Sequence, residues 1–183
     1  MWNLPNLLSL GRILLVPVLV VVLLTELDGK EFIGLGLFLL AALTDFLDGF
    51  LARRRREITN LGKLLDPAAD KILTSAAFIS LVGLGLAPAW MVVVVVSREF
   101  AVSTLRSLAA SQNLVVPAAL SGKIKTTTQI IAISLAIVSG ELGRLGQLAP
   151  IALWVAVIAT VYSGFEYFFR LGRRVIGGEP GTA

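Results

Sequence analysis

Long apolar runs alternate with short polar or charged breaks along the whole chain. The runs predict helices near residues 7–25, 32–52, 66–86, 88–108, 121–140 and 148–170. Most of these runs reach the roughly 20 residues that a helix needs to cross a hydrocarbon core about 30 Å thick. The breaks are too short to fold as separate domains. The pattern therefore predicts an all-α integral membrane protein, a bundle of six transmembrane helices that forms a single domain over residues 1–183.

The composition agrees with a membrane protein. Hydrophobic residues make up 56% of the chain, charged residues make up 15%, and the mean hydropathy is +0.87. The chain contains no Cys and no His, which excludes thiolate nucleophiles, imidazole bases and the usual zinc sites. Any chemistry must therefore use carboxylates, hydroxyls and amines, and we expect no nucleic-acid partner.

Lysine and arginine gather on one side of the predicted bundle. With six spans both termini share a side, and that side carries 14 of the 16 basic residues, Arg12 among them, whereas the other side carries Lys30 and Arg144. Because cytoplasmic flanks carry the excess of Lys and Arg, both termini are expected in the cytoplasm, with the protein in the lipids of the plasma (inner) membrane. The first apolar run lacks a small-residue cleavage site, so we expect a retained helix.

Four aspartates interrupt the apolar pattern between residues 44 and 71. Asp45 and Asp48 lie three residues apart, and Asp66 and Asp70 lie four apart, so each pair shares one face of a helix. Four such groups facing lipid would cost about 10 kcal/mol or more, so they must line a polar cavity. Oxygen ligands suit Mg²⁺ or Mn²⁺, and carboxylate-bound metal pairs recur in displacement reactions at phosphorus.

Smaller residues and one arginine accompany the aspartates. Gly49, Ala52 and Gly62 leave room for a ligand against the helix backbone, although tight helix packing in membranes uses the same residues. Arg53 can hold a phosphate. The proline at position 67 disfavours helical geometry at Asp66, which predicts that a helix starts there.

The spacing D-x2-D-G-x2-A-R-x8-G-x3-D-x3-D, from Asp45 to Asp70, resembles the signature of the CDP-alcohol phosphatidyltransferases. The resemblance implies a six-helix membrane enzyme, usually a homodimer, that moves a phosphatidyl or similar group from a CDP-linked donor to an alcohol. It implies that the metal ligands are Asp45, Asp48, Asp66 and Asp70, and that Asp70 is also the catalytic base. It implies that the CDP donor is bound by Thr44, Asp48, Gly49, Ala52, Arg53 and Gly62.

Several cations lie on the cytoplasmic side of the fourth and fifth predicted helices, namely Arg98, Arg106, Lys123 and Lys125. They suit an acceptor that carries its own phosphate, although basic residues at helix ends also mark topology. Three stretches, NLPNLLSLGR (3–12), SREF (97–100) and GKIKTTTQ (122–129), together resemble the bacterial members of the family that make phosphatidylglycerophosphate. This resemblance implies CDP-diacylglycerol and sn-glycerol 3-phosphate as substrates, with inositol phosphate as the alternative acceptor. The sequence leaves the roles of Glu99, Glu166 and Arg170 open.

A divalent-cation or proton-coupled transporter is the alternative from another functional class, because it would also need an acid-lined cavity. Transporters favour inverted repeats and sites at the membrane midplane. The chain shows no internal repeat, and its charges gather towards one membrane face. The pattern therefore favours an enzyme.

Overall fold

The computed structural model describes the backbone of residues 4–55, 60–111 and 120–176, and the side chains of residues 7–44, 67–111 and 120–171. Within these ranges the chain is helical and contains no strand. The helices are α1 (Leu4–Leu24), α2 (Lys30–Arg55), α3 (Asn60–Gly83), α4 (Ala89–Ser111), α5 (Leu120–Ile137), the short 3₁₀ helix η1 (Gly143–Gln147) and α6 (Leu148–Ile176). Each predicted helix is present, so the all-α prediction is confirmed.

The largest differences from the predicted bounds are at the start of α3, which begins at Asn60 instead of residue 66, and at the end of α6, which ends at Ile176 instead of residue 170. Because α3 begins at Asn60, Asp66 lies inside the helix, and the predicted helix start at Asp66 is wrong. A proline inside a membrane helix is tolerated when neighbouring groups satisfy the backbone. Pro67 has no N–H to donate to the backbone carbonyl of Lys63, four residues earlier. The Lys71 ammonium donates a separate hydrogen bond to the carbonyl of Pro67 itself, at 3.1 Å.

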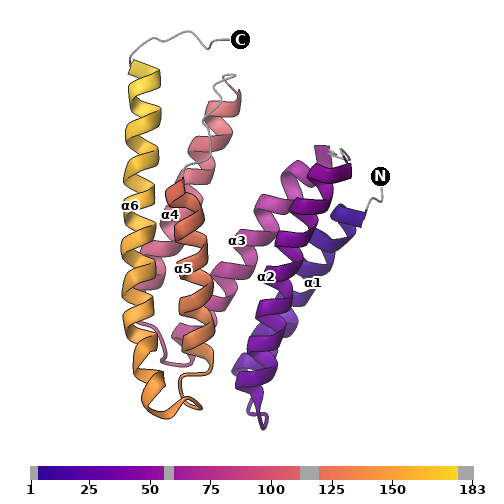
Figure 1. The fold of residues 1–183 in the computed structure, drawn as a ribbon, viewed down its shortest axis with the longest axis vertical. Helices are drawn as coiled ribbons and strands as arrows, with labels where there is room; N and C mark the ends of the chain where they lie inside the picture. The colour runs from indigo at the N-terminus through magenta and orange to yellow at the C-terminus, as the bar shows by residue number, and fades with distance from the viewer. Residues whose placement is uncertain (1–3, 56–59, 112–119, 177–183) are drawn as a thin grey trace.

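The helices form two groups of three that meet at one end of the molecule and diverge at the other (Figure 1). One group contains α1, α2 and α3, and the other contains α4, α5 and α6. Helix α1 begins and α6 ends at the diverging end (Figure 1). Tight turns at the opposite end use Gly29 (φ 72°) and Gly85 (φ 71°), since a positive φ is strained for a residue with a side chain.

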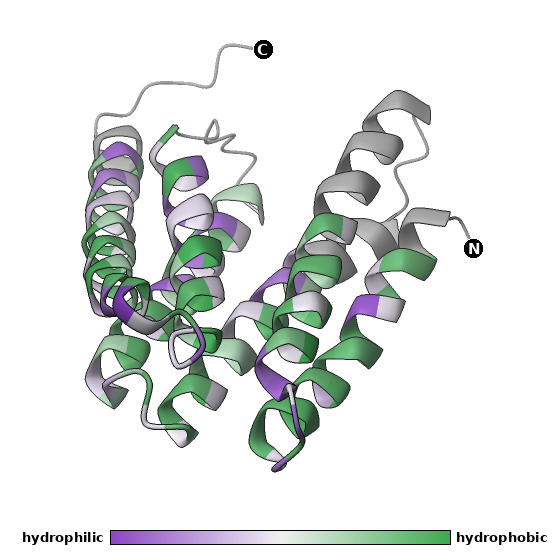
Figure 2. Ribbon diagram, turned by 60° about the horizontal axis from the view of Figure 1, so that its bottom comes forward, coloured by the Kyte–Doolittle hydropathy of each residue, from purple (hydrophilic) through white to green (hydrophobic). Residues whose placement is uncertain are grey.

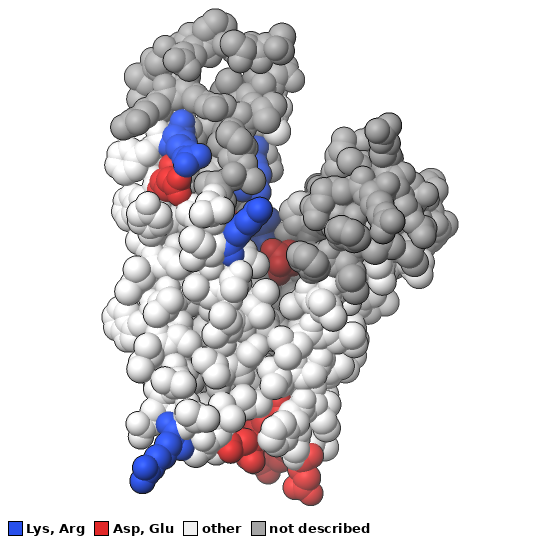
Figure 3. All heavy atoms as spheres, viewed as in Figure 1, with Lys and Arg blue, Asp and Glu red and all other residues white. Residues whose placement is uncertain are grey.

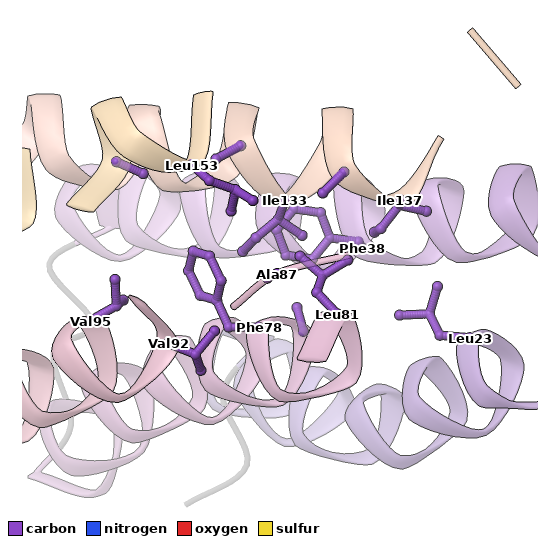
Figure 4. Packing of buried hydrophobic residues seen from close by; sticks show 14 of the residues in the cluster. Leu23, Phe38, Phe78, Leu81, Ala87, Val92, Val95, Ile133, Ile137 and Leu153 are labelled. Carbon is purple, nitrogen blue, oxygen red and sulfur yellow. The ribbon is translucent and has the colours of Figure 1, made fainter. Parts of the chain in front are cut away.

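The main hydrophobic core lies where the two groups meet. Figure 4 shows Phe38 of α2, Phe78 of α3 and Ile133 of α5 pointing towards one another, and all three are at most 2% exposed. A second, smaller cluster joins α4 to α6 through Val102, Ala109, Tyr167 and Leu171. The two groups are therefore fixed to each other below the diverging end.

The outer surface is also apolar. Leu14 is 66% exposed and Phe169 is 67% exposed, and hydrophobic residues occur along the described helices of both groups (Figure 2). Soluble proteins rarely expose apolar surface on this scale. Residues 7–24 and 143–171 form two helices that are long and apolar enough to cross a membrane, and the described parts of α3, α4 and α5 combine apolar surface with charged residues.

Candidate active site

The predicted metal site belongs to α2 and α3, which pack against each other and against α1. Asp70 is half-buried on α3, and the Thr74 hydroxyl donates to its backbone carbonyl at 2.7 Å. Asp45 and Asp48 lie on the helical backbone of α2 and Asp66 on that of α3, but their side chains lie outside the described residues. Two packed helices that carry two aspartates each fit a shared set of oxygen ligands for a divalent metal ion. Among the described side chains, no group of three or more acidic residues gathers, because only Asp70 of the four predicted ligands is included.

The predicted donor site is described only at its edge. Thr44 is half-buried on α2, and its hydroxyl donates to the backbone carbonyl of Leu40 at 2.6 Å. The side chains predicted to complete the site lie outside the described residues, namely Asp48, Gly49, Ala52, Arg53 and Gly62. The donor site therefore stays a prediction.

A buried carboxylate on α4 organises two of the four predicted acceptor cations. Glu99 Oε1 accepts from Lys125 Nζ of α5 at 2.5 Å and from Arg98 Nη1 at 3.2 Å. The side chains of all three residues are at most 14% exposed. One carboxylate thus compensates two buried cations, and the cluster keeps a net positive charge.

Polar groups of α5 and α6 extend this cluster. Gln129 Nε2 donates to Thr160 Oγ1 at 3.0 Å and lies 3.5 Å from Glu99 Oε1. Arg98 Nη2 donates to Ser163 Oγ at 2.8 Å. Gln129, Thr160 and Ser163 were not among the predicted site residues, because isolated polar residues in apolar runs give no sign of which helix they face.

The other two predicted acceptor cations are exposed. Lys123 lies at the start of α5, and Arg106 of α4 has its guanidinium carbon 5.7 Å from the centre of the Tyr167 ring. The four cations therefore divide into a buried, paired set (Arg98 and Lys125) and an exposed set (Arg106 and Lys123).

Lys71 connects this cationic region with the aspartate helices. It lies beside Asp70 on α3 and interacts electrostatically with Asp70, Glu99, Arg106 and Lys125. Figure 3 shows Lys or Arg atoms next to Asp or Glu atoms in the hollow where the two helix groups diverge. One predicted metal ligand, Asp70, is thus the sequence neighbour of a lysine that lies within electrostatic range of two predicted acceptor cations, Arg106 and Lys125.

A further residue of this region was misread from the sequence. Arg12 is only 1% exposed and belongs to the largest fully buried side chains among the described residues, whereas its position in the sequence was interpreted as a topology signal. The signal that could have identified it is spacing: Arg12 precedes Val16, Leu19 and Leu23 by four, seven and eleven residues on one apolar helix face.

Glu166 and Arg170 pair with each other on α6. Their side chains form an ion pair of 2.5 Å in which the Arg170 side chain is 49% exposed. Both line a surface groove of about 420 Å³ together with Tyr162, Phe165 and Phe169. This groove lies on the surface of α6, and the ion pair is separate from the Glu99 cluster.

Comparison with known proteins adds independent information. A sequence model of the family described as CDP-alcohol phosphatidyltransferase matches residues 2–162. A CDP-diacylglycerol–glycerol-3-phosphate 3-phosphatidyltransferase of Bacillus subtilis (strain 168) is 48% identical, over 93% of this chain and 95% of the relative.

More distant relatives cover similar lengths. An enzyme of the same name from Rickettsia bellii (strain RML369-C) is 36% identical over 91% of this chain and 93% of its own. A probable phosphatidylglycerophosphate synthase of Mycobacterium tuberculosis (strain ATCC 25618 / H37Rv) is 37% identical over 99% of this chain and 87% of its own. The similarity therefore extends over nearly the whole of each sequence.

Proposed function

The chain belongs to the CDP-alcohol phosphatidyltransferase family, and from this premise we propose that it transfers the phosphatidyl group of CDP-diacylglycerol to sn-glycerol 3-phosphate. The products are phosphatidylglycerophosphate and CMP, which makes the chain an enzyme of phospholipid biosynthesis. The observation that carries the proposal is that Lys71, the neighbour of Asp70 on α3, lies within electrostatic range of Glu99, Arg106 and Lys125.

The aspartates are proposed to hold the metal. Asp45, Asp48, Asp66 and Asp70 would bind Mg²⁺ or Mn²⁺, because carboxylate oxygens on two packed helices suit these ions. When bound, the metal would offset the negative charge of the donor pyrophosphate. The CDP group is proposed to lie along α2 and the start of α3, against Thr44, Asp48, Gly49, Ala52, Arg53 and Gly62.

Asp70 is the proposed general base. Its carboxylate takes the proton from the primary hydroxyl of sn-glycerol 3-phosphate, and the resulting oxygen attacks the phosphorus that bears diacylglycerol. The bond from this phosphorus to the bridging pyrophosphate oxygen breaks, and CMP leaves. Asp70 suits this role because it is half-buried on α3 and lies next to Lys71, which is within electrostatic range of Arg106 and Lys125.

The acceptor phosphate is proposed to bind among Arg98, Arg106, Lys123 and Lys125. Arg106 and Lys123 are exposed, so they can meet a phosphate that arrives from water. Arg98 and Lys125 are held by Glu99, and the net positive charge of that buried cluster favours an anion nearby. A neutral acceptor would leave this charge without a partner.

The membrane arrangement completes the proposal. We propose a single domain of six spans with both termini in the cytoplasm, in the plasma (inner) membrane, and a homodimer as in the family. Helix α1 begins and α6 ends at the same end of the molecule (Figure 1), and the predicted topology assigns 14 of the 16 basic residues to that side. The donor would enter from the lipid and the acceptor from the cytoplasm.

The direct test is CMP release by the purified protein. CDP-diacylglycerol and Mg²⁺ or Mn²⁺ are supplied with glycerol 3-phosphate, inositol phosphate, inositol, serine or glycerol in turn. We expect release with glycerol 3-phosphate alone. CMP release only with inositol phosphate would agree with the family assignment but contradict glycerol 3-phosphate as the acceptor. No CMP release with any acceptor would contradict the proposed transfer.

Lys123→Gln is expected to raise the KM for glycerol 3-phosphate by about tenfold, because the loss of one charge-assisted hydrogen bond costs about 1.5 kcal/mol or more. The KM for CDP-diacylglycerol should change less than twofold. Steady-state kinetics at saturating concentrations of the other substrate measures both. Lys30→Gln, at the opposite end of the molecule, is the matched control. An unchanged acceptor KM in Lys123→Gln would move the phosphate site elsewhere.

A further inference from the structure

Arg12 points into the helix group that carries the aspartates. Its side chain is 1% exposed and lies on the same face of α1 as Val16, Leu19 and Leu23, which are at most 6% exposed and belong to the main core. Helix α1 packs against α2 and α3, and Figure 1 shows these three helices as one group. The Arg12 guanidinium is therefore buried towards α2 and α3.

The level of Arg12 along α2 follows from a contact near the opposite end. The side chain of Leu23 on α1 lies directly against Gly34 on α2. The two helices run in opposite directions (Figure 1). Arg12 lies eleven residues before Leu23 on α1, and Asp45 lies eleven residues after Gly34 on α2. At 1.5 Å per residue both positions lie about 16 Å from the contact, so Arg12 is level with Asp45.

A second contact gives the level along α3. Leu24 of α1 lies next to Gly83 of α3. A Cβ atom added to Gly83 would lie 3.3 Å from a methyl carbon of Leu24. These helices run in the same direction (Figure 1). Arg12 lies twelve residues before Leu24 on α1, and Lys71 lies twelve residues before Gly83 on α3. Asp70 directly precedes Lys71. Both neighbouring helices therefore present an aspartate position at the level of Arg12.

The buried guanidinium of Arg12 needs an acidic counter-ion nearby. A guanidinium keeps its charge inside a protein, and an unpaired buried charge is strongly destabilising. The acidic residues described at the other end of α1 and α2 are too far away to pair with Arg12. The nearest of them in the sequence, Glu26, is 14 residues from Arg12, or about 21 Å along the helix axis. Among the helices that pack against α1, the aspartates of α2 and α3 are the acidic residues at the level of Arg12.

We propose that Arg12 is the internal counter-cation of the aspartate site and positions its carboxylates before metal binds. This inference rests on the proposed function, in which those aspartates hold a divalent ion. Four carboxylates held close together repel one another when metal is absent. A fixed cation on α1 offsets part of this repulsion and keeps α2 and α3 packed, so that the ligands are in place when the metal arrives.

Thermal unfolding of the purified full chain, with EDTA or with a series of Mg²⁺ concentrations, tests the proposal. Arg12→Gln removes the charge and keeps hydrogen-bond donors. In EDTA we expect its unfolding temperature to fall by about 10 °C. Mg²⁺ should raise that temperature by several degrees more than in the wild type, because the metal replaces the missing positive charge. Arg144→Gln, at the opposite end, is the matched control and should behave as the wild type.

Arg12→Lys keeps the charge, so it should retain most of the metal-free stability and respond to Mg²⁺ as the wild type does. An equal response to Mg²⁺ in the wild type and Arg12→Gln would overturn the proposal. So would an Arg12→Lys variant as unstable as Arg12→Gln, since shape rather than charge would then matter. CMP release by the wild type is measured in parallel, so a failure of the proposed transfer is distinguished from a failure of the counter-cation role.

Discussion

Asp70→Asn is expected to lower kcat for phosphatidyl transfer by about a thousandfold or more while leaving the affinity for CDP-diacylglycerol within about threefold of the wild type. An amide cannot take the proton from the acceptor hydroxyl, and general-base catalysis contributes roughly 10²–10⁴ in rate. The donor is proposed to be held mainly along α2. Because Thr74 donates to the backbone carbonyl of Asp70 rather than to its carboxylate, that hydrogen bond survives the substitution.

Two measurements separate catalysis from binding in this variant. Single-turnover CMP release gives the rate, and binding of a labelled donor in detergent gives its affinity. Asp28→Asn makes the same chemical change in the turn between α1 and α2, at the opposite end of the molecule, and should leave both values unchanged. Near-normal turnover in Asp70→Asn would remove this residue as the base. Loss of donor binding together with turnover would instead assign Asp70 mainly to the donor site.

The helices could be predicted from the sequence because apolar runs of about 20 residues have few alternatives in a membrane. The ends were harder to predict. Helix α3 begins at Asn60, within a polar stretch, and passes through Pro67. Residue propensity alone disfavours that path. Packing of α3 against α1 and α2 outweighs the local preference.

The aspartate site stays a prediction, and it rests on spacing along single helices. The i, i+3 and i, i+4 intervals around Asp45, Asp48 and Asp70 can be read directly from the chain. Pairs between helices cannot be read in this way. Glu99 meets Lys125, 26 residues later, and the sequence assigned Lys125 to the acceptor without its carboxylate partner. Arg12 was predicted to be a basic residue at the cytoplasmic end of a helix, because its position near the predicted membrane boundary does not show which way its side chain faces.

A second large effect is expected on the free energy of unfolding, when the charge of Glu99 is removed. Glu99→Gln should lower the free energy of unfolding by about 3–5 kcal/mol, because it leaves Arg98 and Lys125 buried without a counter-charge. For a chain of 183 residues this corresponds to roughly 10 °C in the unfolding temperature. Circular dichroism or fluorescence during heating in detergent measures the change. Glu166→Gln removes the same charge from the half-exposed Glu166–Arg170 pair and should change the unfolding temperature little.

Lys125→Met provides the sharper comparison, because the cluster contains two cations and one carboxylate. Removing Lys125 leaves Glu99 paired with Arg98 at 3.2 Å, so the buried charge becomes balanced. Removing the charge of Glu99 leaves two like charges instead. Lys125→Met should therefore destabilise the protein clearly less than Glu99→Gln, and adding Lys125→Met to Glu99→Gln should restore part of the lost stability. If Lys125→Met proved as damaging as Glu99→Gln, the ammonium would stabilise the helix group through its own packing, and the charge balance of the cluster would not be what holds α4, α5 and α6 together.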